Sequence, residues 1–311
     1  MQTQLGLSTT APVNVLTTAH KGVDTVVALI AKEAPQDYKQ FLQIETTEQA
    51  FERILQYSGF GYSRQIGESS PFPSDARVLA GKADIVPIMM GNGFSISKQA
   101  KVTDVYNIAG RWAKDIAISH QATIELVGEN FFNNAFSSSF VSYNPDQLPL
   151  STTSHQLADL SNVSNYGDGT YSVSLSYPNL EKCLLQMEQR VDHRGVPAPI
   201  RGKKKIYGPP VLAALGERLT TSTKYPQTNY NDPSYVNGRL EWVTLYQLTS
   251  STAFFIAPAD VSECHGRMLR RIALEVESDY KVETKTYVFT IGEEVAVYSV
   301  DWRSYQCSPG T

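Results

Sequence analysis

The segment from residue 57 to residue 100 constrains the fold most, because it is long and has little capacity to form a core of its own. Glycine, proline and serine interrupt its short strand-like pieces, such as RVLAG and ADIVPIMM. A segment of this kind is uncommon inside a compact domain unless it serves a function. We therefore predict a protruding two-stranded loop that lies on another molecule, with an irregular β-subdomain as the alternative.

The longest helical pattern of the chain follows directly, over residues 103–133. Thr103 or Asp104 can cap its start. At ~1.5 Å per residue the helix would be roughly 45 Å long, which exceeds the usual length in globular domains and predicts a structural spine. Its apolar face is expected to contain Val105, Ile108, Ala109, Trp112, Ile116, Thr123, Val127 and Phe131.

The chain before the loop predicts an arm and a short helix. Residues 1–20 are polar, rich in threonine and almost uncharged, so we expect an extended arm that becomes ordered on a partner surface. Apolar residues then recur at helical spacing and predict a short amphipathic helix over residues 22–33.

The rest of the chain predicts a mixed α/β middle and a β-rich end. Pro178 opens a predicted helix with one apolar face, and a second helix is predicted at 211–222. After residue 270, apolar and polar residues alternate as in antiparallel strands with one solvated face, with a hairpin turn expected at Gly292 and Glu293. Further strands are predicted for TYSVSLS, KKIYGPP, RLEWVTLYQL and TAFFIAP.

Composition excludes several classes of protein. With 41% hydrophobic and 19% charged residues, the 311-residue chain can bury a sizeable core. Its formal net charge of -4 argues against a protein that neutralises many phosphates. The three cysteines are far apart and form no CxxC pair, so neither a disulfide framework nor a zinc site is expected. The absence of a signal-peptide pattern and of a long apolar run predicts a cytosolic protein without a membrane span.

The sequence favours a protein that is not an enzyme and needs no cofactor. It contains no nucleophile elbow, P-loop, dinucleotide fingerprint or HExxH motif. The adjacent Asp192, His193 and Arg194 could be mistaken for an active site, and a hydrolase using Asp192 and His193 is one hypothesis. We favour a turn at the C-terminus of a helix, where basic side chains oppose the helix dipole and Gly195 permits the exit.

A basic cluster follows this turn, formed by Arg201, Lys203, Lys204 and Lys205. Four like charges in five residues could contact phosphate, but they are also typical of a solvated loop. Because no aromatic residues are interleaved, we favour a solvated loop or a contact between subunits.

The order of these parts resembles the major capsid proteins of tailed bacteriophages, of the Hong Kong 97 type. GFGYSRQIGESSPFP resembles the start of that family's extended loop, and LPLSTTSHQ resembles a short L-S-T-x-H region, with an extra residue before His155. The stretch from Asp192 resembles a D-x-x-G-x-P turn that is followed by a strand, Pro-Pro and a helix. The loop return and spine are matched by Gly93, Phe94, Ser97, Asp104, Ala113, Ser119, Glu125, Asn134, Ala135 and Phe136.

The resemblance covers roughly residues 50–260 and implies an α+β fold. That fold has an N-terminal arm, an extended β-hairpin loop, a long spine helix, and peripheral and axial domains. The implied boundaries are 1–35 for the arm and first helix, 36–56 for the start of the peripheral domain, 57–100 for the extended loop, 101–164 for the peripheral domain with the spine, 165–262 for the axial domain, and 263–311 for strands that return mainly to the peripheral domain.

The resemblance also implies a function. The chain would assemble into hexamers and pentamers of an icosahedral virion shell around double-stranded DNA, in the host cytoplasm, with a separate scaffolding protein, a portal and decoration proteins as partners. The alternative is the shell of a cellular, encapsulin-like nanocompartment. Cross-linking through lysine and asparagine is not predicted, because those positions cannot be matched. The candidate subunit-contact residues are Arg64, Glu68, Asp75, Arg77, Lys82, Arg201, Lys203, Lys204 and Lys205.

Overall fold

The computed structural model describes residues 36–103, 108–138, 144–157, 161–225 and 232–310. The predicted arm, the predicted helix at 22–33, and Asp104 lie outside the described residues. The chain divides into two compact units, which we treat one by one. Of the described chain, the smaller unit contains Met89–Ile124 and Ile272–Glu294, and the larger unit contains the remainder.

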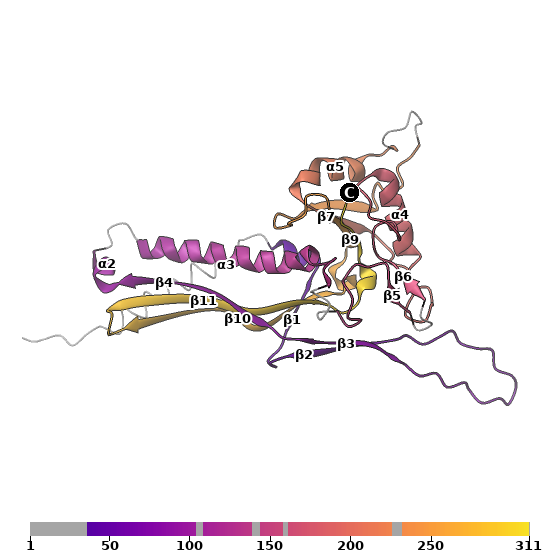
Figure 1. Ribbon diagram of the computed structural model, residues 1–311, viewed down its shortest axis with the longest axis horizontal. Helices are drawn as coiled ribbons and strands as arrows, with labels where there is room; N and C mark the ends of the chain where they lie inside the picture. The colour runs from indigo at the N-terminus through magenta and orange to yellow at the C-terminus, as the bar shows by residue number, and fades with distance from the viewer. Residues whose placement is uncertain (1–35, 104–107, 139–143, 158–160, 226–231, 311) are drawn as a thin grey trace, which may run out of the picture. The chain divides into compact units, whose positions relative to one another are not determined.

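The central sheet of the larger unit has the strand order β12-β9-β7-β8. Its strands β7 and β9 are labelled in Figure 1. Strand β7 pairs in parallel with β8 and antiparallel with β9, which pairs antiparallel with β12. These strands and the helices beside them are α4 (Tyr177–Glu188), β7 (Lys204–Gly208), α5 (Pro210–Thr221), β8 (Leu240–Thr244), β9 (Phe254–Pro258) and β12 (Gln306–Ser308). All but β12 had been predicted from the sequence.

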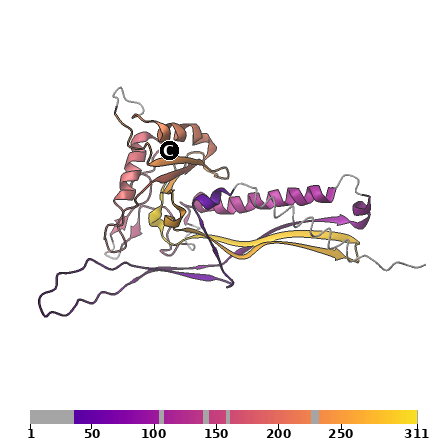
Figure 2. The ribbon, with the colours of Figure 1, turned by 180° about the vertical axis from the view of Figure 1, so that it is seen from behind.

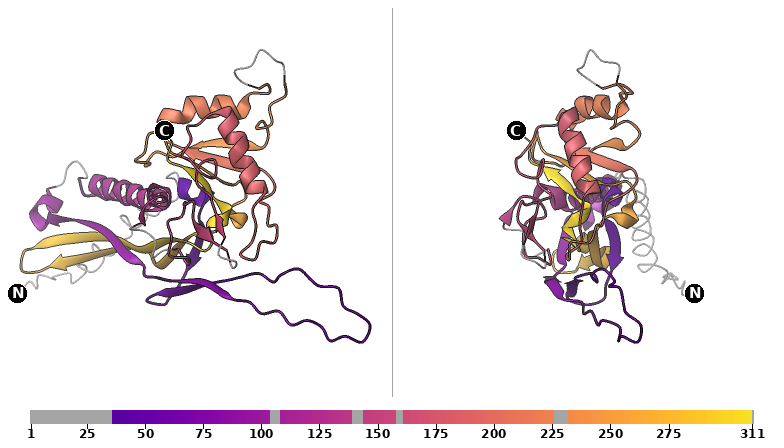
Figure 3. Two further views of the ribbon diagram at one scale, coloured as in Figure 1. Left: turned by 45° about the vertical axis from the view of Figure 1, so that its right-hand side comes forward. Right: turned by 90° about the vertical axis from the view of Figure 1, so that its right-hand side faces the viewer.

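Side chains alternate across this sheet, so that its two faces bury different partners. Ile206 lies opposite Ile256 in the register, and both belong to the core cluster that contains apolar residues of α4 and α5. The helices lie over the sheet in Figure 3. The packing is close, because a Cβ atom at Gly216 of α5 would lie 2.0 Å from the Trp242 ring. A side chain at that position would displace α5 from the sheet.

The opposite face of the sheet buries a cluster of aromatic rings. Phe132, near the end of α3 (Ile108–Asn133), stacks on Phe255 with ring centroids 4.5 Å apart and contacts Phe41 at 4.6 Å. Tyr207 and Tyr305 complete the contacts of this ring, at 5.6 Å and 6.0 Å. The cluster therefore joins five segments that are distant in sequence. One of them is the segment after η1 (Asp37–Gln40), which leads into β1 (Gln43–Thr46).

The same end of α3 carries two buried carboxyl groups. Glu125 accepts a hydrogen bond from the Tyr38 amide at 3.4 Å, and Glu129 accepts one from the Gln247 amide at 2.7 Å. Burial, reinforced by the nearby Asp37 charge, raises the pKa of each carboxyl to about 7. Between them, a Cβ atom at Gly128 would lie 2.5 Å from the Tyr38 Cβ atom. This side of α3 is thus shaped for close contact with η1.

One predicted strand of the larger unit is absent from the described chain. Residues 170–176 form no strand, although the sequence TYSVSLS alternates as a strand does. The Val173 amide donates to the Ser308 hydroxyl at 3.0 Å, and that hydroxyl donates to the Val173 carbonyl at 2.7 Å. A side chain of β12 therefore takes the place of a strand ladder.

In the smaller unit, α3 covers strands of a sheet whose order is β1-β10-β11-β4 (Figure 2). Ala117 of α3 packs with Ile291, and Phe94 stacks on Phe289 at 5.0 Å. Trp112, predicted on the buried face, is 45% exposed and touches Phe94 edge-on, because Ala113 occupies the inner position. The elements are β4 (Ile88–Ser97), α2 (Lys98–Val102), β10 (Gly266–Lys281) and β11 (Thr286–Ser299), and β4, β10 and β11 extend into the larger unit.

The predicted alternation of the C-terminal strands is confirmed, but the predicted turn at Gly292 and Glu293 is wrong. From Arg271 to Lys281, every second residue of β10 is exposed. The turn lies at residues 282–285, and Lys285 there has a φ of 51°. Gly292 lies within β11, where a Cβ atom would be 3.4 Å from the Met89 sulfur. Gly292 is therefore part of a strand and not of a turn.

Replacement of Phe132 by alanine tests the aromatic cluster. The ring is fully buried, so we expect the free energy of unfolding to fall by about 3–5 kcal/mol. Chemical denaturation of the purified protein measures this loss. The matched control is Phe72→Ala, which removes an exposed ring and should change stability by less than about 0.5 kcal/mol. Equal losses in both variants would contradict the proposed importance of the cluster.

The two buried carboxyl groups predict a pH dependence of stability. With folded pKa values of about 7 and an ordinary value of 4.5, the folded chain binds protons that the unfolded chain has lost. The stabilisation is complete below pH 4.5 and decreases as the pH rises to about 7, by about 3 kcal/mol per group. Glu129→Gln should flatten this decrease in denaturation curves, whereas Glu277→Gln on exposed β10 should not.

Candidate assembly surface

The extended loop begins and ends in a two-stranded antiparallel hairpin. Strand β2 (Glu52–Tyr57) pairs with β3 (Leu79–Ile85), and residues 58–78 connect them without strands (Figure 1). The last part of the predicted loop range, 57–100, contains β4, which belongs to the four-stranded sheet. The prediction of a two-stranded loop, as opposed to a β-subdomain, agrees with this hairpin.

One face of the hairpin is covered and the other is open. Ala83 and Ile85 are buried in a cluster with Tyr298 of β11. On the other face Leu55 and Tyr57 are exposed, and the Arg53 guanidinium pairs with Asp84 at 2.6 Å and 2.8 Å. The β2–β3 ribbon thus presents an apolar strip with one ion pair across it.

The loop beyond the hairpin carries large exposed aromatic side chains. Phe72 is 86% exposed, Tyr62 is 71% exposed, and Phe60 is about half exposed. Such side chains contribute about 1.5–3 kcal/mol each when they become fully buried. Aromatic residues are also enriched at protein interfaces. We therefore take residues 58–78 with the open face of β2–β3 as the candidate assembly surface.

The charged residues predicted for this surface occupy different surroundings. Arg64 and Glu68 are exposed along the loop, and Lys82 is exposed on β3. The Arg77 guanidinium lies 5.0 Å from the centroid of the Phe60 ring, an attractive cation–π geometry. These four side chains lie on or near the candidate surface and remain predicted contacts.

Asp75 has an additional role at the base of the loop. Its carboxylate accepts the Gly61 amide at 2.9 Å and the Arg194 guanidinium at 2.7 Å. These two donors, the Gly61 amide foremost, hold the pKa of the Asp75 carboxyl below its ordinary value. The two legs of the loop are further joined by the Ser58 hydroxyl, which accepts the Val78 amide at 2.9 Å.

The predicted basic cluster does not behave as one solvated loop. Arg201 and Lys203 are exposed, whereas Lys205 is half-buried in β7 and donates to the Gln40 side chain at 3.2 Å. Lys204 is 2% exposed, and burial lowers the pKa of its ammonium group. Lys204 is therefore no subunit-contact candidate on this geometry, because the alternation of β7 points it inward.

Asp192, His193 and Arg194 form the predicted turn, but not at a helix end, because α4 ends at Glu188. The Asp192 carboxylate accepts the Arg194 and Val196 amides at 2.7 Å and 2.9 Å, and Gly195 has a φ of 77°. Among the described residues, no hydrogen bond joins Asp192 to His193. The carboxylate thus caps a turn and does not orient an imidazole.

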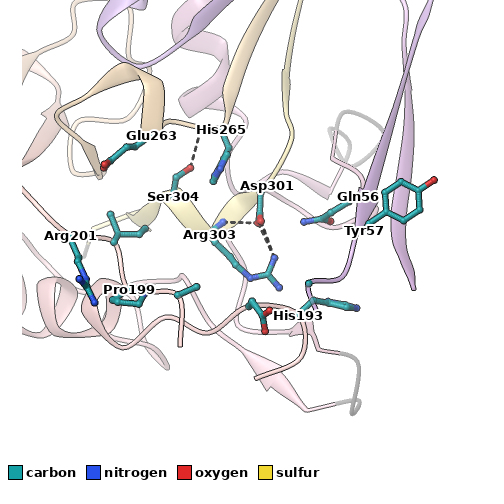
Figure 4. A pocket seen from close by; sticks show the side chains of 14 residues that line it. Gln56, Tyr57, His193, Pro199, Arg201, Glu263, His265, Asp301, Arg303 and Ser304 are labelled. Carbon is teal, nitrogen blue, oxygen red and sulfur yellow. Dashed lines mark hydrogen bonds and ion pairs between the residues drawn. The ribbon is translucent and has the colours of Figure 1, made fainter. Parts of the chain in front are cut away.

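A hollow of about 540 Å³ lies beside this turn (Figure 4). It is lined by Tyr57, His193, His265 and Arg303, among other residues, and Arg303 pairs there with Asp301 at 3.0 Å. Burial lowers the pKa of both histidines, so both are neutral near pH 7. In the described residues the hollow shows no pair of nucleophile and base.

The sequence did not predict the role of His155, which is fully buried. Its ring lies on Trp302 with centroids 3.9 Å apart, and its two nitrogens lie 2.7 Å from the Asp146 carboxylate and 3.2 Å from the Asn165 side-chain oxygen. The Arg190 guanidinium lies 5.2 Å from the centroid of the same Trp302 ring. His155 thus joins the loop at Asp146 to the loop at Asn165 and belongs to the interior, not to a functional surface.

The cysteines give no sign of a metal or redox site. Cys183, Cys264 and Cys307 are all buried and unpaired with one another, and burial raises the pKa of each thiol to about 12. Across the described chain, no group of three potential ligands could hold a metal ion. Within the same residues, no helix has the length and apolar character needed to cross a bilayer.

No protein-family model matches the sequence, and a comparison with curated proteins finds no match. Solved structures do match. The capsid of the cyanophage P-SCSP1u aligns over 88% of each chain, with 9% identity and a TM-score of 0.57. The capsid of a native GTA particle aligns over 88% of this chain and 91% of its own, with 9% identity and a TM-score of 0.56.

The chain has a capsid-protein fold. A virus-like particle from Pyrococcus furiosus shares this fold over 93% of the present chain and 98% of its own, with 8% identity and a TM-score of 0.53. The predicted α+β fold of the Hong Kong 97 type is thereby confirmed. In the described chain, the candidate assembly surface carries several of the large apolar side chains that are exposed, among them Phe60, Tyr62 and Phe72.

Replacement of Phe72 by serine tests the candidate assembly surface. We expect unchanged stability of the subunit, because the ring is exposed, and an approximately tenfold higher concentration for assembly, because an apolar contact is lost. Light scattering against concentration measures the change. The control is Gln65→Ala, a polar change in the same loop. An unchanged threshold for Phe72→Ser would remove this ring from the surface.

Proposed function

We propose that this chain is the major capsid protein of a tailed phage. It self-assembles into hexamers and pentamers of an icosahedral shell that encloses double-stranded DNA. The observation that carries the proposal is the capsid fold combined with a long loop whose aromatic side chains find no cover within the subunit. Assembly with copies of the same chain supplies that cover.

The physical basis is the burial of a surface that the subunit cannot bury alone. Residues 58–78 have no core, so ordering them against a neighbour costs conformational entropy, which is offset by burying side chains such as Phe72 and Tyr62. A loop that contacts a different region of the next subunit makes a heterologous contact, which closes into rings when the rotation allows it. Hexamers and pentamers are such rings.

The division of the subunit into domains is part of the proposal. The axial domain, about 165–262, contains α4, α5 and β7–β9, and would gather around the capsomer axes. The peripheral domain consists of 36–56 and 101–164, with the spine helix, and receives the strands of 263–311. Arg201 and Lys203 are exposed in the axial part and are proposed as contacts there.

The partners follow from the same proposal. A net charge of -4 suits a shell that surrounds DNA without condensing it, since condensation requires concentrated positive charge. No sequence-specific DNA contact is proposed. A separate scaffolding protein, a portal and decoration proteins are proposed partners, with assembly in the host cytoplasm and a final place in the virion. Neither catalysis nor a cofactor forms part of the proposed role.

A cellular nanocompartment shell is the second candidate. It is favoured by the likeness to the virus-like particle from Pyrococcus furiosus, which extends over 98% of that chain. The two candidates differ in their contents, because a phage shell holds DNA and a nanocompartment holds protein. Nuclease treatment and mass spectrometry of purified particles distinguish them.

Electron microscopy of the purified, assembled chain tests the proposed function. We expect uniform closed shells with sixfold and fivefold capsomers. Co-expression with the scaffolding protein is included, since a subunit that needs scaffold would not assemble alone. A monodisperse monomer under every condition would contradict the proposal.

Shortening the extended loop tests whether the loop is needed for shell formation. Replacing residues 63–73 by a short Gly-Ser link should leave the circular dichroism and melting temperature of the subunit unchanged, because all of these residues except the partly buried Ile66 are exposed. Stable shells should no longer form. Persistent shells in this variant would show that the loop is not needed for assembly.

A further inference from the structure

The turn at residues 192–195 holds the extended loop by one arginine. The Arg194 guanidinium donates from Nη1 to the Asp75 carboxylate at 2.7 Å and from Nη2 to the Ala76 carbonyl oxygen. Its side chain is only 22% exposed, so the pair is partly shielded from water. Residues 119 positions apart are thereby joined, and both lie in the larger unit.

Asp75 also binds the other leg of the loop, at Gly61. One carboxylate oxygen takes the arginine, and the other accepts the Gly61 amide at 2.9 Å. A single carboxylate therefore closes the base of the loop and attaches it to the turn. Residues 62–74, the part of the loop beyond Gly61 and Asp75, are all described. Within them the Ser70 amide donates a hydrogen bond to the Gly67 carbonyl oxygen.

The turn also touches the outgoing leg directly. A Cβ atom at Gly59 would lie 2.5 Å from the Asp192 carboxylate, so a side chain there would push the leg away from the turn. Asp192 is itself fixed, because it accepts the amides of Arg194 and Val196. Arg194 is consequently presented from a rigid backbone, with Gly195 in the left-handed region that the turn needs.

We propose that the turn at residues 192–195 is a clasp that sets the direction in which the extended loop leaves the subunit, before any neighbouring subunit binds. Arg194 is its positioning residue. Its importance for assembly rests on the proposed function, because a loop already held in place loses less conformational freedom when it docks. The clasp itself is a property of the single subunit and can be measured there.

Limited trypsin digestion and hydrogen exchange of the unassembled subunit test the clasp. In Arg194→Ala we expect cleavage after Arg64 and exchange of the Gly61 amide to accelerate about threefold, the order expected for a partly exposed ion pair. The melting temperature should stay unchanged. Arg194→Lys keeps the charge but loses the planar fork, so it should restore part of the protection.

Two further variants make the result decisive. Arg201→Ala removes an exposed arginine from the same connection and should leave the loop unchanged. Asp75→Ala should accelerate cleavage as Arg194→Ala does, and it carries the test if Arg194→Ala fails to fold. Wild-type rates in both clasp variants would overturn the clasp, whether or not shells form. Accelerated rates in a chain that never forms shells would leave the clasp standing and refute the proposed function.

Discussion

The ring of Phe132 is the contact on which the larger unit depends. It lies where the end of α3, strands β7 and β9, the segment before β1 and the C-terminal residues before β12 converge. Each of these segments carries apolar side chains that are buried only when the segments pack against one another. The proposed clasp at Arg194 and the hairpin at β2–β3 both depend on the segments packed around Phe132. A loop keeps a defined direction only when the residues that hold it are themselves fixed by packing.

Much of the fold was predictable because its patterns are local. The helix that begins at Tyr177 follows from Pro178 and the spacing of Leu180, Cys183, Leu184 and Met187, and all of these apolar positions are buried. Strand β9 follows from its run of apolar residues, since a strand covered on both faces needs no alternation. The capsid-type order of parts survives at 8–9% identity because it depends on such patterns and not on particular residues.

The remainder was not predictable because it depends on distant partners. In the sequence, Lys204 belongs to a run of basic residues that is typical of a charged loop. The pairing of β7 with β8 and β9 places Lys204 in a strand and turns its side chain inward. Residues 170–176 alternate like a strand, but the hydroxyl of Ser308 takes their backbone hydrogen bonds. Asp75 was predicted as a candidate contact residue, yet its pairing with Arg194 is visible only in three dimensions. The role of His155 depends in the same way on Trp302.

The burial of all three cysteines has a practical consequence for the proposed shell. Thiols with a pKa of about 12 are neutral at ordinary pH and inaccessible, so they do not compete for thiol-directed reagents. A single cysteine introduced at an exposed position would then be the one reactive thiol per chain. Every such group would recur with the symmetry of the particle, which would turn the shell into a lattice of evenly spaced attachment points for dyes, antigens or enzymes.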